Sequence, residues 1–222
     1  MSEKRTIGIL GVSANPMHDG HVAAGLLALH ELHLNEVWFM VTPHSPHKDS
    51  GSYAPLEHRM HLAHLALMPT GRLGNKLKVS DFEAALLRYG EENSTANMLE
   101  RFTEVYPSYQ PVWLMGADNL KSFHTWGRWQ EIIERYPLGV LGRYGEGDAL
   151  QSIAAKEYEA ARVASTDFKA EPGTWSFIED KAHSASSTQI RAEIARGISP
   201  SHLTADADMY IKQYGLYGAK TQ

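Results

Sequence analysis

The amino-acid sequence predicts an α/β fold organised around parallel strands, and three observations indicate it. Six short apolar runs have the character of buried strands: residues 7–10, 36–41, 77–81, 111–116, 138–142 and 175–178. Stretches with apolar residues at helical spacing separate several of these runs, the first over residues 22–34. The first run, this helix and the second run occupy about 35 residues, the size of a right-handed βαβ unit.

Length and composition indicate an ordinary globular protein. The 222 residues suit one domain over residues 1–222, with 43% hydrophobic and 21% charged side chains. The 26 acidic and 21 basic side chains give a formal net charge of −5, which disfavours a nucleic-acid partner. No apolar run reaches transmembrane length, and residues 1–6 lack a signal-peptide core. Because cysteine is absent, we exclude disulfides and thiolate metal sites and expect a cytoplasmic protein.

The stretch from Gly11 to His21 joins the first predicted strand to the first predicted helix. Such a turn presents backbone N–H groups and the positive end of a helix, which together favour phosphate. Gly11 and Gly20 let the backbone approach a ligand closely, and Asn15 precedes a proline, as is typical of a turn. His18 and His21 are three residues apart, so at a helix start they project from one face and form a candidate polyphosphate clamp. A lone pair of this kind also arises by chance among 12 histidines, so the interpretation depends on the strand, turn and helix around it.

Two further segments follow the ends of predicted strands, which is where doubly wound sheets bind ligands. Residues 43–48 contain two prolines and end at Lys48, which either reaches a phosphate or is a solvated loop lysine. Asp118 comes two residues after the fourth predicted strand. A carboxylate there is well placed for a ribose hydroxyl or for a water bound to Mg²⁺.

Thr95 and Trp126 each have a structural and a functional interpretation. Ser94 or Thr95 opens a predicted helix that runs to about residue 106, and either hydroxyl can cap it. Trp126 and Trp129 are three residues apart, which is typical of a helix core or of a surface that stacks on an aromatic ring. The sequence alone leaves both interpretations open.

Two other predicted helices offer no clear function. The helix over residues 55–68 carries His58, His61 and His64, but no carboxylate or cysteine partner is evident, so metal binding is disfavoured. Residues 143–172 are rich in alanine with scattered charges, and they predict a helix over residues 149–164.

Hydroxyl side chains gather before a predicted helix near the C-terminus. Residues 184–188 are Ser-Ala-Ser-Ser-Thr, and helix capping explains only one of these hydroxyls. The others, with Arg191 one turn into the helix, suit a phosphate held by helix N–H groups and a guanidinium. Ser187 and Thr188 are therefore candidate phosphate ligands. A last helix is expected over residues 206–215.

These stretches resemble two signatures of the nucleotidyltransferase superfamily. Residues 11–21 resemble Gly-x-Phe-Asp/Asn-Pro-x-His-x-Gly-His: the match holds at Asn15, Pro16, His18, Gly20 and His21, and Ala14 stands where an aromatic residue is usual. Residues 185–191 resemble Ile-Ser-Ser-Thr-x-Ile-Arg, with Ala185 in place of the first isoleucine. The Pro-x-x-Pro-His-Lys loop, the Leu-Met-Gly-Ala-Asp-Asn-Leu stretch and the Trp-x-Arg-Trp block are similar to bacterial nicotinate-nucleotide adenylyltransferases. The resemblance covers the chain from Ile7 to Tyr217.

The resemblance implies a doubly wound, Rossmann-like parallel sheet with helices on both faces. It implies transfer of AMP from ATP to nicotinate mononucleotide, with Mg²⁺ held mainly by ATP phosphates and water. The catalytic residues it implies are His18, His21, Lys48 and Arg191. The implied ATP and phosphate ligands are Gly11, Ser13, Asn15, Gly20, Ser187 and Thr188. Thr95, Asp118 and Trp126 would bind nicotinate mononucleotide, with Trp126 stacked on the pyridine ring and Thr95 at the carboxylate.

Other acceptors and another class of protein stay open. The same chemistry could serve nicotinamide mononucleotide, pantetheine phosphate or, with CTP, an alcohol phosphate. Trp126 and the block of residues 116–119 favour a pyridine nucleotide. A nucleotide-binding sensor without turnover is the alternative from a different class. The sequence leaves a homo-oligomer open.

Overall fold

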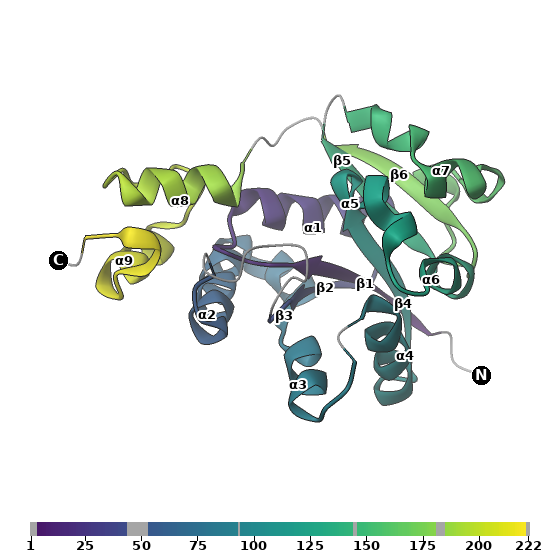
Figure 1. The fold of residues 1–222 in the computed structure, drawn as a ribbon, viewed down its shortest axis with the longest axis horizontal. Coiled ribbons are helices and arrows are strands. Elements are labelled where there is room, and N and C mark those ends of the chain that lie inside the picture. The colour runs from purple at the N-terminus through teal and green to yellow at the C-terminus, as the bar shows by residue number, and fades with distance from the viewer. Residues whose placement is uncertain (1–3, 44–52, 93, 144–145, 181–184, 221–222) are drawn as a thin grey trace.

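All six predicted strands form one parallel sheet in a computed structural model that describes residues 4–43, 53–92, 94–143, 146–180 and 185–220. The strands are β1 (Arg5–Val12), β2 (Glu36–Val41), β3 (Leu77–Ser80), β4 (Tyr109–Gly116), β5 (Leu138–Arg143) and β6 (Trp175–Asp180). Their order is β3-β2-β1-β4-β5-β6, and every neighbouring pair is parallel. The order reverses direction between β1 and β4, so the predicted doubly wound fold is confirmed (Figure 1).

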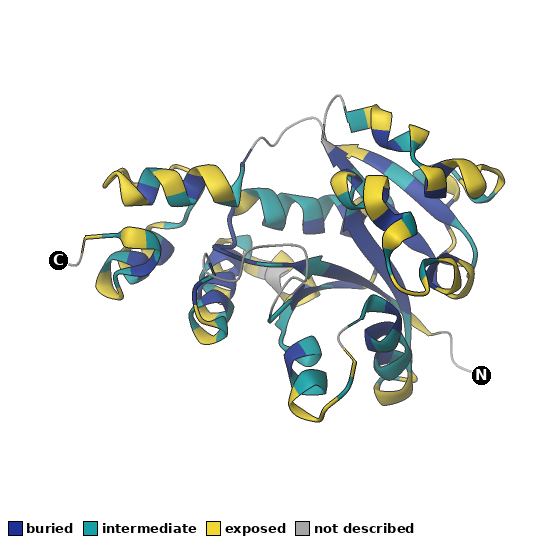
Figure 2. Ribbon diagram, viewed as in Figure 1, coloured by how far each residue is buried: buried dark blue, intermediate teal, exposed yellow. Residues whose placement is uncertain are grey.

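Helices cover both faces of the sheet. Side chains alternate along β1, so Ile7 and Ile9 join one core and Leu10 and Val12 join the other. The first core includes residues of α4 (Thr95–Val105), α5 (Ala117–Ser122), α6 (Trp129–Arg135) and α7 (Ile153–Glu157). The second core includes residues of α1 (Asp19–Glu31) and α2 (Leu56–Leu67). Because both faces are covered, the strands are continuous apolar runs, and Figure 2 shows them as largely buried.

The C-terminal helices pack on α2 rather than on the sheet. These are α8 (Ser187–Ala195) and α9 (Ala205–Gln213), which lie at one end of the molecule in Figure 1. Their apolar side chains form a third cluster around Leu62 of α2, with Ile190, Ile194, Ile211 and Leu216. This cluster holds α8 beside the start of α1, which is the position that matters for the site.

The structure differs from the predicted elements over residues 149–164 and between β3 and α4, and it decides which of two residues caps α4. Residues 149–164 are not one helix: a 3₁₀ helix over Glu146–Gln151 is followed by α7 and by a second 3₁₀ helix over Glu159–Ala161. The cause is Ser152, whose Oγ accepts a hydrogen bond from the Ala155 N–H at 3.3 Å and so starts a new helix. The short helix α3 (Phe82–Arg88) was not predicted. At α4 the cap is Ser94, whose Oγ accepts from the Asn97 N–H at 3.3 Å, so Thr95 is the first helical residue. Among the described residues, none of the helices is long and apolar enough to cross a membrane.

Candidate active site

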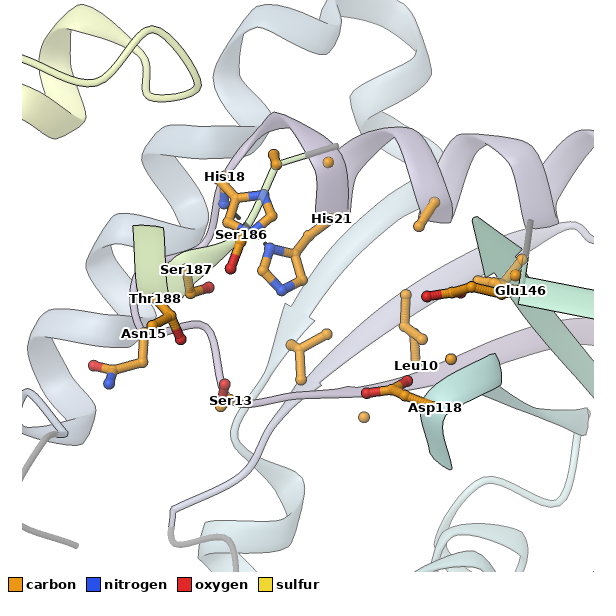
Figure 3. Close-up of a pocket in the computed structure, with 18 of the residues that line it drawn as sticks. Leu10, Ser13, Asn15, His18, His21, Asp118, Glu146, Ser186, Ser187 and Thr188 are labelled. Atoms are coloured by element: carbon orange, nitrogen blue, oxygen red, sulfur yellow. Dashed lines mark hydrogen bonds between the residues drawn. The ribbon is translucent and has the colours of Figure 1, made fainter. Parts of the chain in front are cut away.

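A cavity of about 350 Å³ lies at the carboxyl ends of β1 and β4, where the strand order reverses. Open α/β sheets bind their ligands at this point. The cavity is lined by residues from the β1–α1 turn, the end of β4, the end of β5 and the start of α8. The polar side chains among them are Ser13, Asn15, His18, His21, Tyr53, Asp118, Glu146, Ser186, Ser187, Thr188 and Arg191 (Figure 3). The two sequence motifs, more than 160 residues apart, therefore meet at one cavity.

The two histidines of the first motif stand together at the start of α1. His18 precedes the helix as its N-cap and is 5% exposed, and its ring lies 3.9 Å from that of His21 between centroids. The backbone N–H of His18 donates to Nδ1 of His21 at 3.3 Å. Because Nδ1 accepts this bond, the proton of a neutral His21 resides on Nε2. His21 therefore presents an N–H donor on the side of its ring away from the backbone, and Figure 3 shows that ring extending towards the cavity.

Helix α8 is fastened directly to the β1–α1 turn. Arg191 donates from Nη1 to the Asn15 carbonyl oxygen at 2.8 Å, and Ser187 donates from Oγ to the Pro16 carbonyl oxygen at 3.1 Å. Arg191 also lies 3.4 Å from the Thr188 hydroxyl. These bonds place the start of α8, with its positive helix end, beside the start of α1. Two helix N-termini therefore converge on the same cavity, which is an environment suited to a polyphosphate.

Two glycines of the first motif sit where a side chain would collide. A Cβ on Gly20 would lie 3.1 Å from the His18 ring and 3.2 Å from the Cβ of Ala185. A Cβ on Gly11 would lie 2.9 Å from the Trp113 ring. Gly20 thus lets residue 185 pack against the histidine turn, whereas Gly11 keeps β1 close to β4.

The opposite end of the cavity is acidic. Figure 3 shows Asp118, from the first turn of α5, and Glu146 on the side away from His18 and His21. The sequence interpretation assigned no function to residues 143–172, so Glu146 was missed. No local signal marks this glutamate, because only the folding of the chain after β5 brings it to the β1–β4 edge. The cavity has hydrogen-bond donors at one end and carboxylate acceptors at the other.

Three predicted site residues are not among the lining residues that the structure describes. Lys48 is outside the described residues. Thr95, at the start of α4, and Trp126 do not line the cavity. The Trp126 ring packs edge-on against Phe123 at 5.4 Å and against Trp113 at 6.5 Å, between centroids. The Trp113 ring also packs against Gly11, so this one ring separates Trp126 from the start of the β1–α1 turn. The roles of Thr95 and Trp126 in binding nicotinate mononucleotide stay predictions.

The donor set of the cavity suits a metal ion that arrives with its nucleotide. Among the described residues there is no cluster of three or more His, Cys, Asp or Glu side chains able to hold a metal ion. His58 instead pairs through Nδ1 with the Tyr210 hydroxyl at 2.9 Å, and the His61 ring stacks on Tyr210. Asp118 offers the hard oxygen ligand that Mg²⁺ prefers, directly or through a water molecule. Mg²⁺ itself remains a prediction.

A parallel sheet with the glycine- and histidine-containing β1–α1 turn at its crossover, and a hydroxyl-rich helix start facing that turn, defines a nucleotide-binding α/β protein of the nucleotidyltransferase type. The chain belongs to the cytidylyltransferase-like family, whose model matches residues 9–193.

Curated relatives of similar length carry one name. A protein of Mesorhizobium japonicum named "probable nicotinate-nucleotide adenylyltransferase" is 38% identical over 86% of this chain and 96% of its own length. A protein of Cereibacter sphaeroides with the same name is 40% identical over 84% of this chain and 96% of its own.

Solved structures confirm the fold. The nicotinic acid mononucleotide adenylyltransferase of Plasmodium falciparum, complexed with NaAD, superimposes with a TM-score of 0.73. The alignment covers 98% of this chain and 100% of that one at 16% identity. A putative nicotinate-nucleotide adenylyltransferase of Vibrio parahaemolyticus gives a TM-score of 0.62 at 20% identity, covering 96% of both chains.

Proposed function

We propose that this chain transfers AMP from ATP to nicotinate mononucleotide, forming nicotinate adenine dinucleotide and releasing pyrophosphate. The observation that carries the proposal is the convergence of both motifs on one cavity at the β1–β4 crossover. The names of the curated relatives supply the substrate.

The reaction needs positioning and charge stabilisation more than it needs a base. The attacking group is the phosphate of the mononucleotide, which is largely dianionic at neutral pH because its second pKa is about 6. One of its oxygens forms a bond to the α-phosphorus of ATP. The bond from that phosphorus to the oxygen bridging the α- and β-phosphates breaks, and pyrophosphate leaves with the electron pair. Two anions must approach each other, so the protein has to offset their repulsion.

The donor end of the cavity supplies that stabilisation. His21 presents its Nε2–H to an oxygen of the reacting α-phosphate, and His18 lies beside it at the helix start. Arg191, with Ser187 and Thr188, holds the departing pyrophosphate at the start of α8. We assign Lys48 to the departing pyrophosphate as a further positive charge. Mg²⁺, if it binds with ATP, would be held in part by Asp118 and would offset the negative charge of the phosphates.

The asymmetry of the cavity sets the direction in which ATP lies. The triphosphate accepts hydrogen bonds, so it occupies the end with the histidines and Arg191. Adenosine offers ribose hydroxyls and a 6-amino group as donors, which suit the carboxylates of Asp118 and Glu146. We also assign Asp118 to a ribose hydroxyl of nicotinate mononucleotide, as the sequence predicts. Trp126 and Thr95 are assigned to the nicotinate ring and its carboxylate.

The decisive experiment is pyrophosphate release with ATP, Mg²⁺ and either nicotinate or nicotinamide mononucleotide, measured in parallel. A strong preference for nicotinate supports both the reaction and the substrate. Equal use keeps the reaction but refutes the proposed specificity. If neither acceptor works, pantetheine phosphate and CTP with alcohol phosphates are tested next, and binding of ATP without any turnover would indicate a sensor. A cytoplasmic location and a homo-oligomer are further predictions, the latter tested by light scattering.

A further inference from the structure

Arg59, on the first turns of α2, is a buried arginine whose hydrogen bonds go to main-chain carbonyl oxygens. It is 1% exposed. Its Nε donates to Ala54 at 2.9 Å, and its Nη1 donates to Ser13 and to Thr42, each at 2.7 Å. Its Nη2 donates to Pro43 at 2.8 Å. One guanidinium therefore joins the end of β1, the end of β2 and the residues before α2.

The same network holds the β1–α1 turn from a second side. The N–H of Ala54, whose carbonyl oxygen binds Arg59, donates to the side-chain oxygen of Asn15 at 3.1 Å. Arg59 and Ala54 thus fasten Ser13 and Asn15 to the region before α2. On the other side, α8 fastens Asn15 and Pro16 through Arg191 and Ser187.

The result is a turn in which three carbonyl oxygens are bound to side-chain donors. Ser13, Asn15 and Pro16 each direct a carbonyl oxygen to a side-chain donor. A carbonyl oxygen that faced the cavity would repel a phosphate, whereas one bound to a donor is held away from it. Ser13 and Asn15 line the cavity, so the orientation of their peptide groups determines what an anion meets there.

Arg59 also places a positive charge behind the turn. Its hydrogen-bond acceptors are all neutral carbonyls, and no carboxylate in the described parts of the chain forms an ion pair with it. The Tyr53 ring lies 5.2 Å from its guanidinium carbon. Burial lowers the pKa of Arg59, yet a guanidinium stays protonated in proteins. A buried charge without an opposite partner is costly, and a bound polyphosphate on the far side of the turn would offset part of that cost.

We propose that Arg59 is a positioning residue for the triphosphate of ATP. It holds the Ser13 carbonyl oxygen away from the cavity, fixes the Asn15 side chain through Ala54, and places its buried positive charge behind the turn. This inference rests on the proposed use of ATP. It predicts that replacing Arg59 lowers kcat/KM for ATP and leaves the KM for nicotinate mononucleotide nearly unchanged.

The test compares Arg59→Lys and Arg59→Met with Glu36→Gln as a matched control. Glu36 is 4% exposed and lies at the opposite end of β2, where its side chain accepts from Arg5 and Trp38 and pairs with Lys78. It shares a buried, charged, hydrogen-bonded character with Arg59 but is remote from the cavity. For Arg59→Met we expect kcat/KM for ATP to fall by about 10- to 100-fold, the range seen when the supporting partner of a binding group is lost. The KM for nicotinate mononucleotide should change less than twofold.

Two further readouts separate positioning from general loss of structure. Arg59→Lys keeps the charge but cannot reach all of the carbonyls, so it should recover part of the ATP effect. Inorganic tripolyphosphate, titrated by calorimetry, should bind the wild type at least tenfold more tightly than Arg59→Met. That binding can be measured even if the wild type makes no dinucleotide, so the proposed function and this inference fail separately. If Arg59→Met is folded and binds tripolyphosphate like the wild type, or if Glu36→Gln shows the same kinetic change, the inference is wrong. If Arg59→Met does not fold, Arg59→Lys is measured instead. Wild-type affinity for tripolyphosphate in that variant, or the same kinetic change in Glu36→Gln, would then contradict the inference.

Discussion

Glu83, in the first turn of α3, links burial to the pH dependence of stability. Burial raises the pKa of this carboxyl group from its ordinary value of 4.5 to about 7. The charged form is disfavoured because the side chain leaves water without gaining a cationic partner. Replacing Glu83 with Gln removes the titration and keeps nearly the same shape.

The sign follows from the protons that each state binds. Below pH 4.5 the carboxyl is protonated in both the folded and the unfolded chain, so Glu83 causes no penalty. Between pH 4.5 and about pH 7 the unfolded chain ionises while the folded chain keeps its proton, so the free energy of unfolding falls as pH rises. At about 1.4 kcal/mol per pH unit, the loss is about 3 kcal/mol and is complete above pH 7.

The assay is urea unfolding of wild type and Glu83→Gln between pH 4.5 and pH 8. Taking the difference between the two proteins cancels the other titrating groups. We expect the variant to gain about 3 kcal/mol relative to wild type across this range. Two stability curves that run parallel from pH 4.5 to pH 8 would refute the burial of an uncompensated carboxyl at this position.

Three further variants test the site. His21→Ala should lower kcat by about 100-fold or more and change the KM for ATP only a few-fold, because the proposed role of the His21 N–H is to bind the reacting phosphate. Near-normal turnover would contradict that role, and so would an equal effect of His64→Ala, a change at an exposed histidine. Gly20→Ala should lower kcat about tenfold, because its Cβ would lie 3.1 Å from the His18 ring and displace it, whereas Gly147→Ala, where a Cβ meets open space, should be silent. Glu100 of α4 accepts two hydrogen bonds from Arg128, at 2.8 and 3.0 Å, and one from Arg135. These bonds lower the pKa of Glu100 to about 2. Since Arg128 is held at φ 57° two residues after Trp126, Glu100→Gln should raise the KM for nicotinate mononucleotide several-fold and spare that for ATP. Equal changes in both KM values, or the same change in the exposed control Glu104→Gln, would rule out that connection.

The strands and the motifs could be predicted because their signals are local. A buried parallel strand is an unbroken apolar run, so residues such as 36–41 identify β2 without further information. The start of α1 is marked by Gly20 and the two histidines, and the start of α8 by its serines. The helix over residues 149–164 was predicted wrongly, because its composition favours a helix but Ser152 caps a new helix at α7.

Other features depend on contacts between distant residues. No local pattern in the sequence identifies Glu146, because its position at the cavity depends on the path of the chain after β5. Arg59 resembles any helical arginine until β1 and β2 place the carbonyl oxygens of Ser13, Thr42 and Pro43 around it.

The amino-acid sequence by itself determined the parallel α/β architecture, the strand-to-helix turn at residues 11–21 and the hydroxyl-rich start of α8. Tertiary structure alone decided that α8 lies across that turn, that the cavity is basic at one end and acidic at the other, and that Arg59 sits behind it. The physical reason is the range of the interactions. Apolar periodicity and helix capping act over a few residues, whereas the bond from Arg191 to Asn15 joins residues 176 positions apart and exists only after the sheet and the third core have formed.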